Sequence, residues 1–166
     1  MATRYAVRSF CTTLIALLAI GFLATSCKKN GGTDVVDPRD QYLGVYTGNY
    51  RSTLYINNTL PAGDPEVGTV QITVTKAQEA NQVTLDMLFN GATKQTLSAE
   101  LTNDTFTIVN KNSEPLAFGG KTYDAQYVAQ GQFVVKEKTF TLNTTAETVQ
   151  LGVTLTKRGD ITGTMK

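Results

Sequence analysis

The sequence predicts an all-β domain, an antiparallel up-and-down β-barrel of about eight strands, with a β-sandwich as the alternative. Three observations lead to this prediction. Apolar and polar residues alternate along many short segments, tight-turn signals fall between those segments, and no long stretch has the 3.6-residue period of a helix. Such alternation gives each strand one buried and one solvated face, as antiparallel sheets commonly have.

The individual strands follow from the alternating rows. Val70, Ile72 and Val74, for example, alternate with polar residues. Asn90-Gly91 is the strongest hairpin signal, because a type I′ turn needs positive φ at both central residues. We expect strands over 41–50, 52–57, 68–76, 82–89, 92–101, 104–110, 122–135, 138–143 and 147–156, with 157–166 as a candidate further strand. We expect tight turns over 102–104 and 136–138, and longer loops over 58–68 and 110–120.

Two segments place large and small side chains alternately on one face, and this favours a barrel over a sandwich. In "QYLGVYTGNY" (41–50), three tyrosines alternate with two glycines. In "YDAQYVAQGQF" (123–133), aromatic residues share a face with alanines and a glycine. A strongly curved sheet needs such alternation, because small residues let a strand bend and neighbouring rings cover the gap.

The first residues predict export from the cytoplasm. Arg4 and Arg8 precede an apolar run, "LIALLAIGFLA" (14–24), which as a helix would rise only about 16 Å. A bilayer core is about 30 Å thick, so we interpret residues 1–26 as a cleaved signal peptide and not as a membrane span. Cys27 directly follows small residues in "LATSC", a pattern that resembles the lipobox of bacterial lipoproteins. The resemblance implies that Cys27 is lipidated and becomes the new N-terminus.

Residues 27–40 are predicted to form a lipidated flexible linker, and residues 41–166 a single barrel domain. The linker is polar, contains glycines and is broken by Pro38, so it buries too little to fold alone. Several acyl chains on Cys27 would make the membrane attachment stable, since one chain alone binds only marginally. We expect a lipid-anchored protein of the cell envelope, at the outer membrane of a Gram-negative bacterium.

The opening strand also carries a family resemblance. Gly44-Val45-Tyr46 is similar to the G-x-W element of lipocalins, with tyrosine in place of tryptophan, and a strand meander follows it. The chain therefore resembles the lipocalin-like (calycin-like) lipoproteins of bacteria over residues 41–166. This resemblance implies an eight-stranded barrel that holds a small apolar or amphipathic ligand. It also implies that a basic residue near the last strand, Lys157 or Arg158, packs beside Tyr46.

The composition argues against catalysis and against several kinds of partner. The chain contains no histidine, the most frequent general base and zinc ligand. None of the serines of the mature chain, Ser52, Ser98 and Ser113, lies in a G-x-S-x-G context. We therefore predict no enzyme activity, no metal site and no cofactor. The near balance of 15 basic and 14 acidic residues gives no electrostatic case for nucleic acid.

Two functions remain open at this stage. The first is ligand binding inside the barrel, and its candidate lining residues are Tyr42, Tyr46, Tyr50, Tyr123 and Tyr127. Tyrosine combines an apolar ring with a polar tip, although packing of the core would explain the same residues. The second is a non-catalytic interaction module, either a subunit of an envelope complex or an inhibitor of a secreted enzyme. Its contact surface would be the two longer loops, with Leu60, Leu116 and Phe118 at their tips.

Overall fold

The computed structural model describes residues 36–166, and the compact domain runs from Asp37 to Lys166. The predicted signal peptide (1–26) and Cys27 lie outside the described residues. Pro38–Tyr42 forms a short 3-10 helix. The strands are β1 (Gly44–Ile56), β2 (Leu60–Pro61), β3 (Glu66–Lys76), β4 (Gln82–Phe89), β5 (Thr93–Thr102), β6 (Thr105–Ile108), β7 (Ser113–Phe118), β8 (Lys121–Val134), β9 (Thr139–Gln150) and β10 (Val153–Met165).

Eight of these strands close into an antiparallel barrel, which confirms the predicted fold class and rejects the β-sandwich. Closure depends on β1, which pairs with β3 along one edge and with β10 along the other. The β1–β10 ladder is long and runs from Tyr46 opposite Met165 to Ile56 opposite Leu155. Neither strand therefore leaves an open edge along this ladder.

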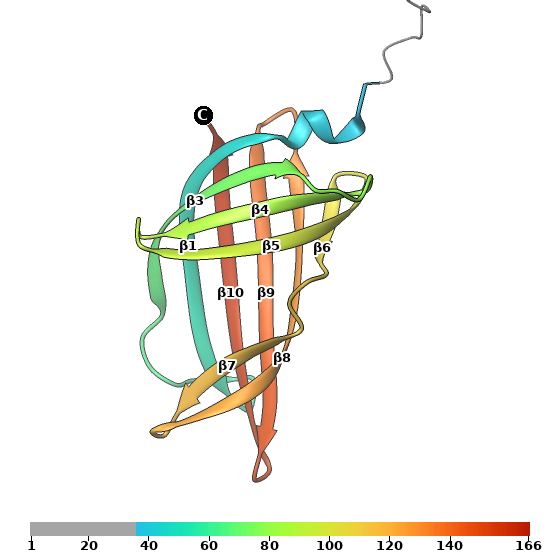
Figure 1. Ribbon diagram of the computed structural model, residues 1–166. Helices are drawn as coiled ribbons and strands as arrows, with labels where there is room; N and C mark the ends of the chain where they lie inside the picture. The colour runs from blue at the N-terminus through green and yellow to red at the C-terminus, as the bar shows by residue number, and fades with distance from the viewer. Residues whose placement is uncertain (1–35) are drawn as a thin grey trace, which may run out of the picture. The chain divides into compact units, whose positions relative to one another are not determined.

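The wall of the barrel is complete only in its upper half, where the 3-10 helix lies (Figure 1). β6 pairs with β8 around Gly131, and β7 pairs with the lower stretch of the same edge, from Ser113 opposite Gln126 onwards. The other edge of β7 pairs with no strand of the described chain. The lower parts of β1, β8, β9 and β10 extend beyond β3, β4 and β5, and β7 crosses them there (Figure 1).

Apolar side chains fill both ends of the lumen. The upper group is the larger and centres on stacked and tilted aromatic rings; its members include Tyr42, Tyr46, Ile72, Leu85, Leu97, Phe106, Phe133 and Phe140. The lower group lies between β7–β8 and the lower part of β1, β9 and β10. It contains Leu116, Ala125, Ala146 and Leu155, with the partly buried Leu54, Ile56 and Tyr123 packed against it.

The alternation of large and small residues acts as predicted. The ring of Phe106 occupies the space that a side chain at Gly131 would need, and a Cβ at Gly163 would press on Tyr46. Gly48 and Gly163 lie opposite each other, and a Cβ at Gly48 would collide with the backbone at Thr162. The glycines therefore let the β1–β10 ladder curve tightly while aromatic rings keep the lumen filled.

The strand bounds required several corrections. The segments predicted as 41–50 and 52–57 form one continuous strand, β1, which begins only at Gly44 because Tyr42 belongs to the 3-10 helix. The predicted loop 58–68 contains β2 and the start of β3. The predicted loop 110–120 contains β7, whose Leu116 is buried. The segment predicted as 147–156 is interrupted by the turn at Leu151-Gly152, so β9 ends at Gln150 and β10 takes in most of the tail. The turn at Asn90-Gly91 is confirmed, since both residues have positive φ.

The end of the predicted linker is bound to the barrel. The guanidinium of Arg39 donates to the carbonyl oxygens of Ala77 (3.1 Å), Glu79 (2.7 Å) and Gln82 (3.1 Å), in the connection between β3 and β4. Asp37 forms ion pairs with Arg39 and with Lys76, the last residue of β3. The Arg39 hydrogen bonds hold the pKa of Asp37 below its usual value. Across residues 36–166, no helix is both long and apolar enough to cross a bilayer.

Candidate functional site

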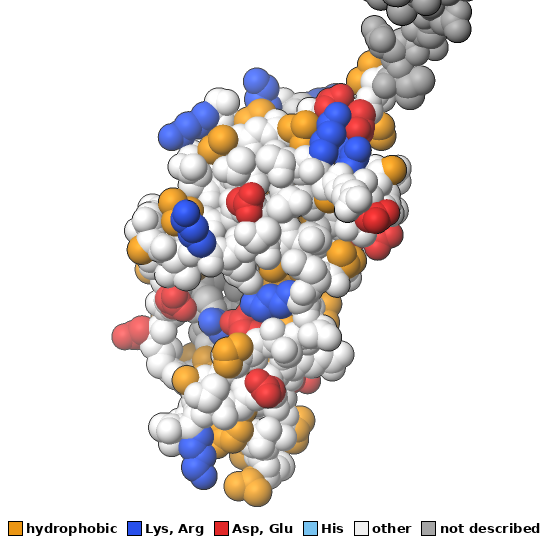
Figure 2. Space-filling model, in the orientation of Figure 1, with side chains coloured by type: hydrophobic (Ala, Val, Ile, Leu, Met, Phe, Trp, Pro, Cys, Tyr) orange, Lys and Arg blue, Asp and Glu red, His pale blue; other side chains and the backbone are white. Residues whose placement is uncertain are grey.

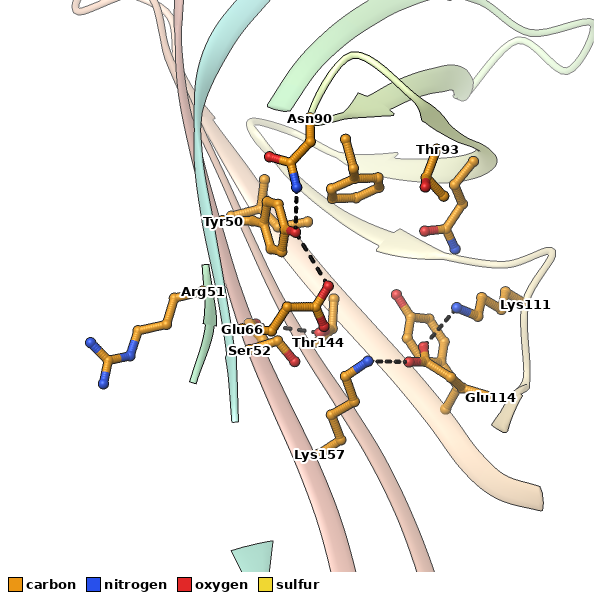
Figure 3. A pocket seen from close by; sticks show the side chains of 15 residues that line it. Tyr50, Arg51, Ser52, Glu66, Asn90, Thr93, Lys111, Glu114, Thr144 and Lys157 are labelled. Atoms are coloured by element: carbon orange, nitrogen blue, oxygen red, sulfur yellow. Dashed lines mark hydrogen bonds and ion pairs between the residues drawn. The ribbon is translucent and has the colours of Figure 1, made fainter. Parts of the chain in front are cut away.

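A cavity of about 300 Å³ lies inside the barrel, between the upper and lower apolar groups. It opens through the incomplete wall, between the β4–β5 turn and β7, and Figure 2 shows basic and acidic side chains around a hollow at mid-height. Figure 3 shows the cavity from close by. The lining residues are Tyr50, Arg51, Ser52, Glu66, Phe89, Asn90, Thr93, Gln95, Lys111, Glu114, Tyr127, Thr144, Lys157, Gly159 and Ile161.

The floor of the cavity is formed by inward positions of three long strands. Ser52 comes from β1, Thr144 from β9, and Lys157 and Gly159 from β10. Gly159 has no side chain to fill the lumen, and a Cβ there would lie 2.5 Å from the hydroxyl of Thr144. Small and polar side chains at this level leave space open between the two apolar groups, which remain joined in one buried cluster.

Two lysines and one glutamate form a charged cluster on one wall. Lys111 Nζ lies 2.7 Å from Glu114 Oε2, and Lys157 Nζ lies 3.1 Å from Glu114 Oε1. The ammonium of Lys111 also lies 4.1 Å from the ring centroid of Tyr127, a cation–π contact. Burial raises the pKa of Glu114, but hydrogen bonds and charges from both lysines outweigh it and lower the pKa below its usual value. Glu114 is therefore ionised at neutral pH.

A second polar network lies on the opposite rim. The side-chain amide of Asn90 donates to the Tyr50 hydroxyl (3.0 Å), which donates to Glu66 Oε1 (3.2 Å). Asn90 Oδ1 also accepts from the backbone N–H of Thr69 (2.9 Å), so the β4–β5 turn is fixed to β3. The ring of Phe89 packs edge-on against Tyr50 at 5.1 Å between centroids. This rim thus presents the rings of Tyr50 and Phe89, and hydrogen bonds to Asn90 and Glu66 fix Tyr50.

Ser52 is an unusual residue on the floor. Its hydroxyl is the one buried side-chain polar atom in residues 36–166 that has no hydrogen-bond partner. A buried hydroxyl without a partner costs roughly 1–3 kcal/mol. Ser52 is therefore a candidate contact for a molecule that occupies the cavity.

The structure divides the five candidate tyrosines between the cavity and the core. Tyr50 and Tyr127 line the cavity. Tyr42 and Tyr46 lie in the upper group, where Tyr42 stacks on Phe133 at 4.7 Å. The hydroxyl of Tyr42 lies 2.8 Å from Asp104 Oδ1, and that of Tyr46 donates to the Tyr42 carbonyl (3.0 Å). Tyr123 is partly buried and packs against the core below the cavity.

The expectation that Lys157 or Arg158 would pack beside Tyr46 is wrong. Lys157 lies opposite Leu54 and Arg158 opposite Thr53, several residues along β1 from Tyr46. Lys157 instead points into the cavity, and Arg158 lies over the Tyr55 ring at 5.2 Å. The residue opposite Tyr46 is Met165.

The roles of Lys111, Glu114 and Lys157 in the cavity were not predicted from the sequence. For two of them a signal exists. Lys157 lies two residues after the buried Leu155, and Glu114 two residues before the buried Leu116, so strand alternation places both on the inward face. A charged residue at an inward position indicates either a buried ion pair or a site. Of the described residues, no three His, Cys, Asp or Glu side chains come together as a metal site would require.

Comparisons with known proteins give only distant structural likeness. The sequence matches no protein family, and it matches no curated protein. One similar solved structure is a protein of unknown function from the DUF3598 family of Nostoc punctiforme (10% identity, TM-score 0.39), which covers 73% of this chain and 47% of that chain. Another is a mutant of the vaccine antigen transferrin binding protein B from Haemophilus parasuis (10% identity, TM-score 0.42), covering 76% of this chain and 28% of that chain. This chain thus spans less than half the length of either structure.

Proposed function

We propose that this protein is a lipid-anchored lipoprotein of the cell envelope whose lipocalin-like barrel binds a small amphipathic molecule. The signal-peptide pattern and Cys27 support export and attachment to the outer membrane. The observation that carries the binding proposal is the cavity of about 300 Å³ between the two apolar groups, which lies within the size range of small-molecule sites.

The lining of the cavity favours an amphipathic ligand over a purely apolar one. Rings of Tyr50, Phe89 and Tyr127 supply apolar surface, while two lysines and several hydroxyl and amide groups supply hydrogen bonds. A long acyl chain would not fit along the barrel axis, because side chains fill the lumen above and below the cavity. The expected ligand is therefore compact, with one polar end.

The proposed role is binding without catalysis. The acidic residues of the cavity are Glu66, which accepts from Tyr50, and Glu114, which is paired with two lysines. A carboxylate held in ion pairs with a lowered pKa is a poor general base at neutral pH. This arrangement supports a transport, storage or sensing role over chemistry on the bound molecule.

Native mass spectrometry of the domain purified from its own host, after removal of the acyl chains, would test this proposal. We expect a small molecule to travel with the wild-type protein. Thr93→Trp, at the exposed rim of the cavity, should block the opening and abolish the adduct. The matched control Val128→Trp, on the outer face of β8, should retain it. Folded wild-type protein with no adduct would argue against the function.

One observation favours an interaction module as the second candidate. Leu151 at the tip of the β9–β10 hairpin is fully exposed, and the neighbouring Val149 is 62% exposed. The tips proposed from the sequence fit less well, because Leu116 is buried and Phe118 packs against the core, which leaves only Leu60 exposed. If the protein is an interaction module, Leu151→Asp should abolish co-purification with an envelope partner. If its function is ligand binding, the same variant should leave co-purification unchanged.

A further inference from the structure

The charges around the cavity are divided between its two sides. Lys111 and Lys157 share the single carboxylate of Glu114, so this wall carries one excess positive charge. Glu66 belongs to the opposite rim, where it is exposed to solvent and bonded to Tyr50. Arg51, although part of the lining, points away from the cavity in Figure 3. Solvent screens the rim charge more strongly than it screens the recessed cluster.

The two ammonium groups keep hydrogen-bonding capacity for a ligand. Each has three N–H donors, and within the described chain each makes one hydrogen bond, to Glu114. Their side chains are 23% and 34% exposed, so they are neither sealed in the core nor free in bulk solvent. Unused donors beside an excess positive charge suit an anionic acceptor.

The aromatic residues define where the rest of such a ligand would lie. The Tyr127 ring lies under the ammonium of Lys111, Phe89 packs edge-on against Tyr50, and all three rings line the cavity. A flat ring between these side chains would bury its faces against apolar surface and place a substituent at the lysines. The volume of about 300 Å³ equals that of about ten water molecules, enough for a single ring with one acidic group.

We propose that the cavity selects a compact, ring-bearing monoanion whose carboxylate lies between Lys111 and Lys157 and whose ring packs between Phe89 and Tyr127. This inference rests on the proposed binding function and specifies its ligand class. Glu114 determines the net charge of the ligand that the cavity accepts. It neutralises one of the two lysines, so a single negative charge completes the balance and a second would be repelled.

Three matched probes that differ only in charge test this inference: benzoate, benzamide and benzylamine. Each is titrated into the ¹⁵N-labelled full domain, and the shifts of the Thr144 and Gly159 amides on the cavity floor report binding there. We expect benzoate to bind at least about tenfold more tightly than benzamide, and benzylamine not to bind. A tenfold ratio corresponds to about 1.4 kcal/mol.

Variants of the cluster then assign the selectivity to its residues. Lys157→Met and Lys111→Met should each remove the preference for benzoate over benzamide, and Lys136→Met, outside the cavity, should leave it unchanged. Glu114→Gln should tighten benzoate binding severalfold and admit the dianion phthalate, which the wild type should reject.

Equal affinity for benzoate and benzamide, or a preference that survives both lysine variants, would overturn the inference. Absence of cavity shifts with all three probes would overturn it as well. The proposed function has its own test. If a neutral or cationic molecule travels with the native protein, that result would contradict the charge selectivity but still support the binding function.

Discussion

Lys157 Nζ lies 3.1 Å from Glu114 Oε1, although 43 positions separate the two residues in the chain. The pair joins the last strand of the barrel to β7, which pairs along only one edge with the rest of the sheet. Lys111 holds the other oxygen of Glu114 at 2.7 Å. One carboxylate thus fixes the position of β7 and forms the charged wall of the cavity.

Glu114→Gln should destabilise the domain in a pH-dependent way. Because both lysines lower the pKa of Glu114, its stabilising contribution is full above the unfolded-state pKa near 4.5 and disappears as pH falls through the folded-state value. We expect a loss of about 1–2 kcal/mol in the free energy of unfolding at pH 7, and no difference from wild type once Glu114 is protonated. Urea unfolding at pH 7 and at stepwise lower pH measures this. A loss that is equal at every pH would contradict the ion-pair account.

Arg39→Lys should loosen the connection between β3 and β4. Arg39 reaches the three carbonyl oxygens with Nη1 while Nε and Nη2 bind the Asp37 carboxylate, and lysine keeps the charge but has no planar fork with which to do both at once. We expect faster hydrogen exchange at the Ala77 and Gln82 amides, which bond within this connection. Arg51→Lys, at an exposed arginine, is the control and should change neither rate. Unchanged exchange in Arg39→Lys would show that the 3-10 helix does not fix the turn.

The fold was predictable because alternation and turn chemistry act locally. Asn90-Gly91 adopts the positive φ angles that a hairpin needs, and the rows around Ile72 and Leu85 become buried strand faces. The strand prediction failed where alternation runs through a turn. Val149, Leu151 and Val153 continue one alternating row in the sequence, yet the chain reverses at Leu151-Gly152, where leucine stands in place of the asparagine of the usual Asn-Gly turn.

The candidate site was less predictable, because it depends on contacts between distant strands. Alternation places the tyrosines of the strands on inward faces. Their position along the barrel axis then decides whether they line the cavity, as Tyr50 does, or pack in the core, as Tyr46 does. Likewise, alternation indicates that Glu114 and Lys157 point inward. Only the successive pairings of β7 with β8, of β8 with β9 and of β9 with β10 bring them together.

Tyr46→Phe should reveal a contribution to stability that is lost at alkaline pH. Burial raises the pKa of Tyr46 to about 12, from an unfolded-state value of 10.0. Its contribution is therefore full below pH 10 and is lost as pH rises toward 12. We expect the variant to be about 1 kcal/mol less stable than wild type at pH 8, since the Tyr42 carbonyl loses its partner, and this gap should shrink at pH 11. Urea unfolding at both pH values checks this, and a gap that widens with pH would refute the assignment.

Leu151→Asn should stabilise the β9–β10 hairpin. Leu151 has a φ of 50°, a left-handed conformation that asparagine tolerates better than leucine, and its fully exposed side chain makes no buried contact to lose. We expect a gain of about 0.5–1 kcal/mol in the free energy of unfolding. Val149→Asn, an exposed position in extended backbone, is the control and should lower stability. A loss of stability in Leu151→Asn would mean that backbone strain is not the dominant effect there.

The central claim, that the lumen keeps an accessible and positively biased cavity between two apolar groups, is tested most directly by fluorescence quenching. The chain has no tryptophan, so Phe89→Trp places a single indole at the cavity. We predict stronger quenching of this indole by iodide than by caesium, loss of that preference on adding Lys157→Met, and no preference for Val128→Trp on the outer face. An indole at position 89 that neither ion quenches, or that both quench equally, would contradict the account.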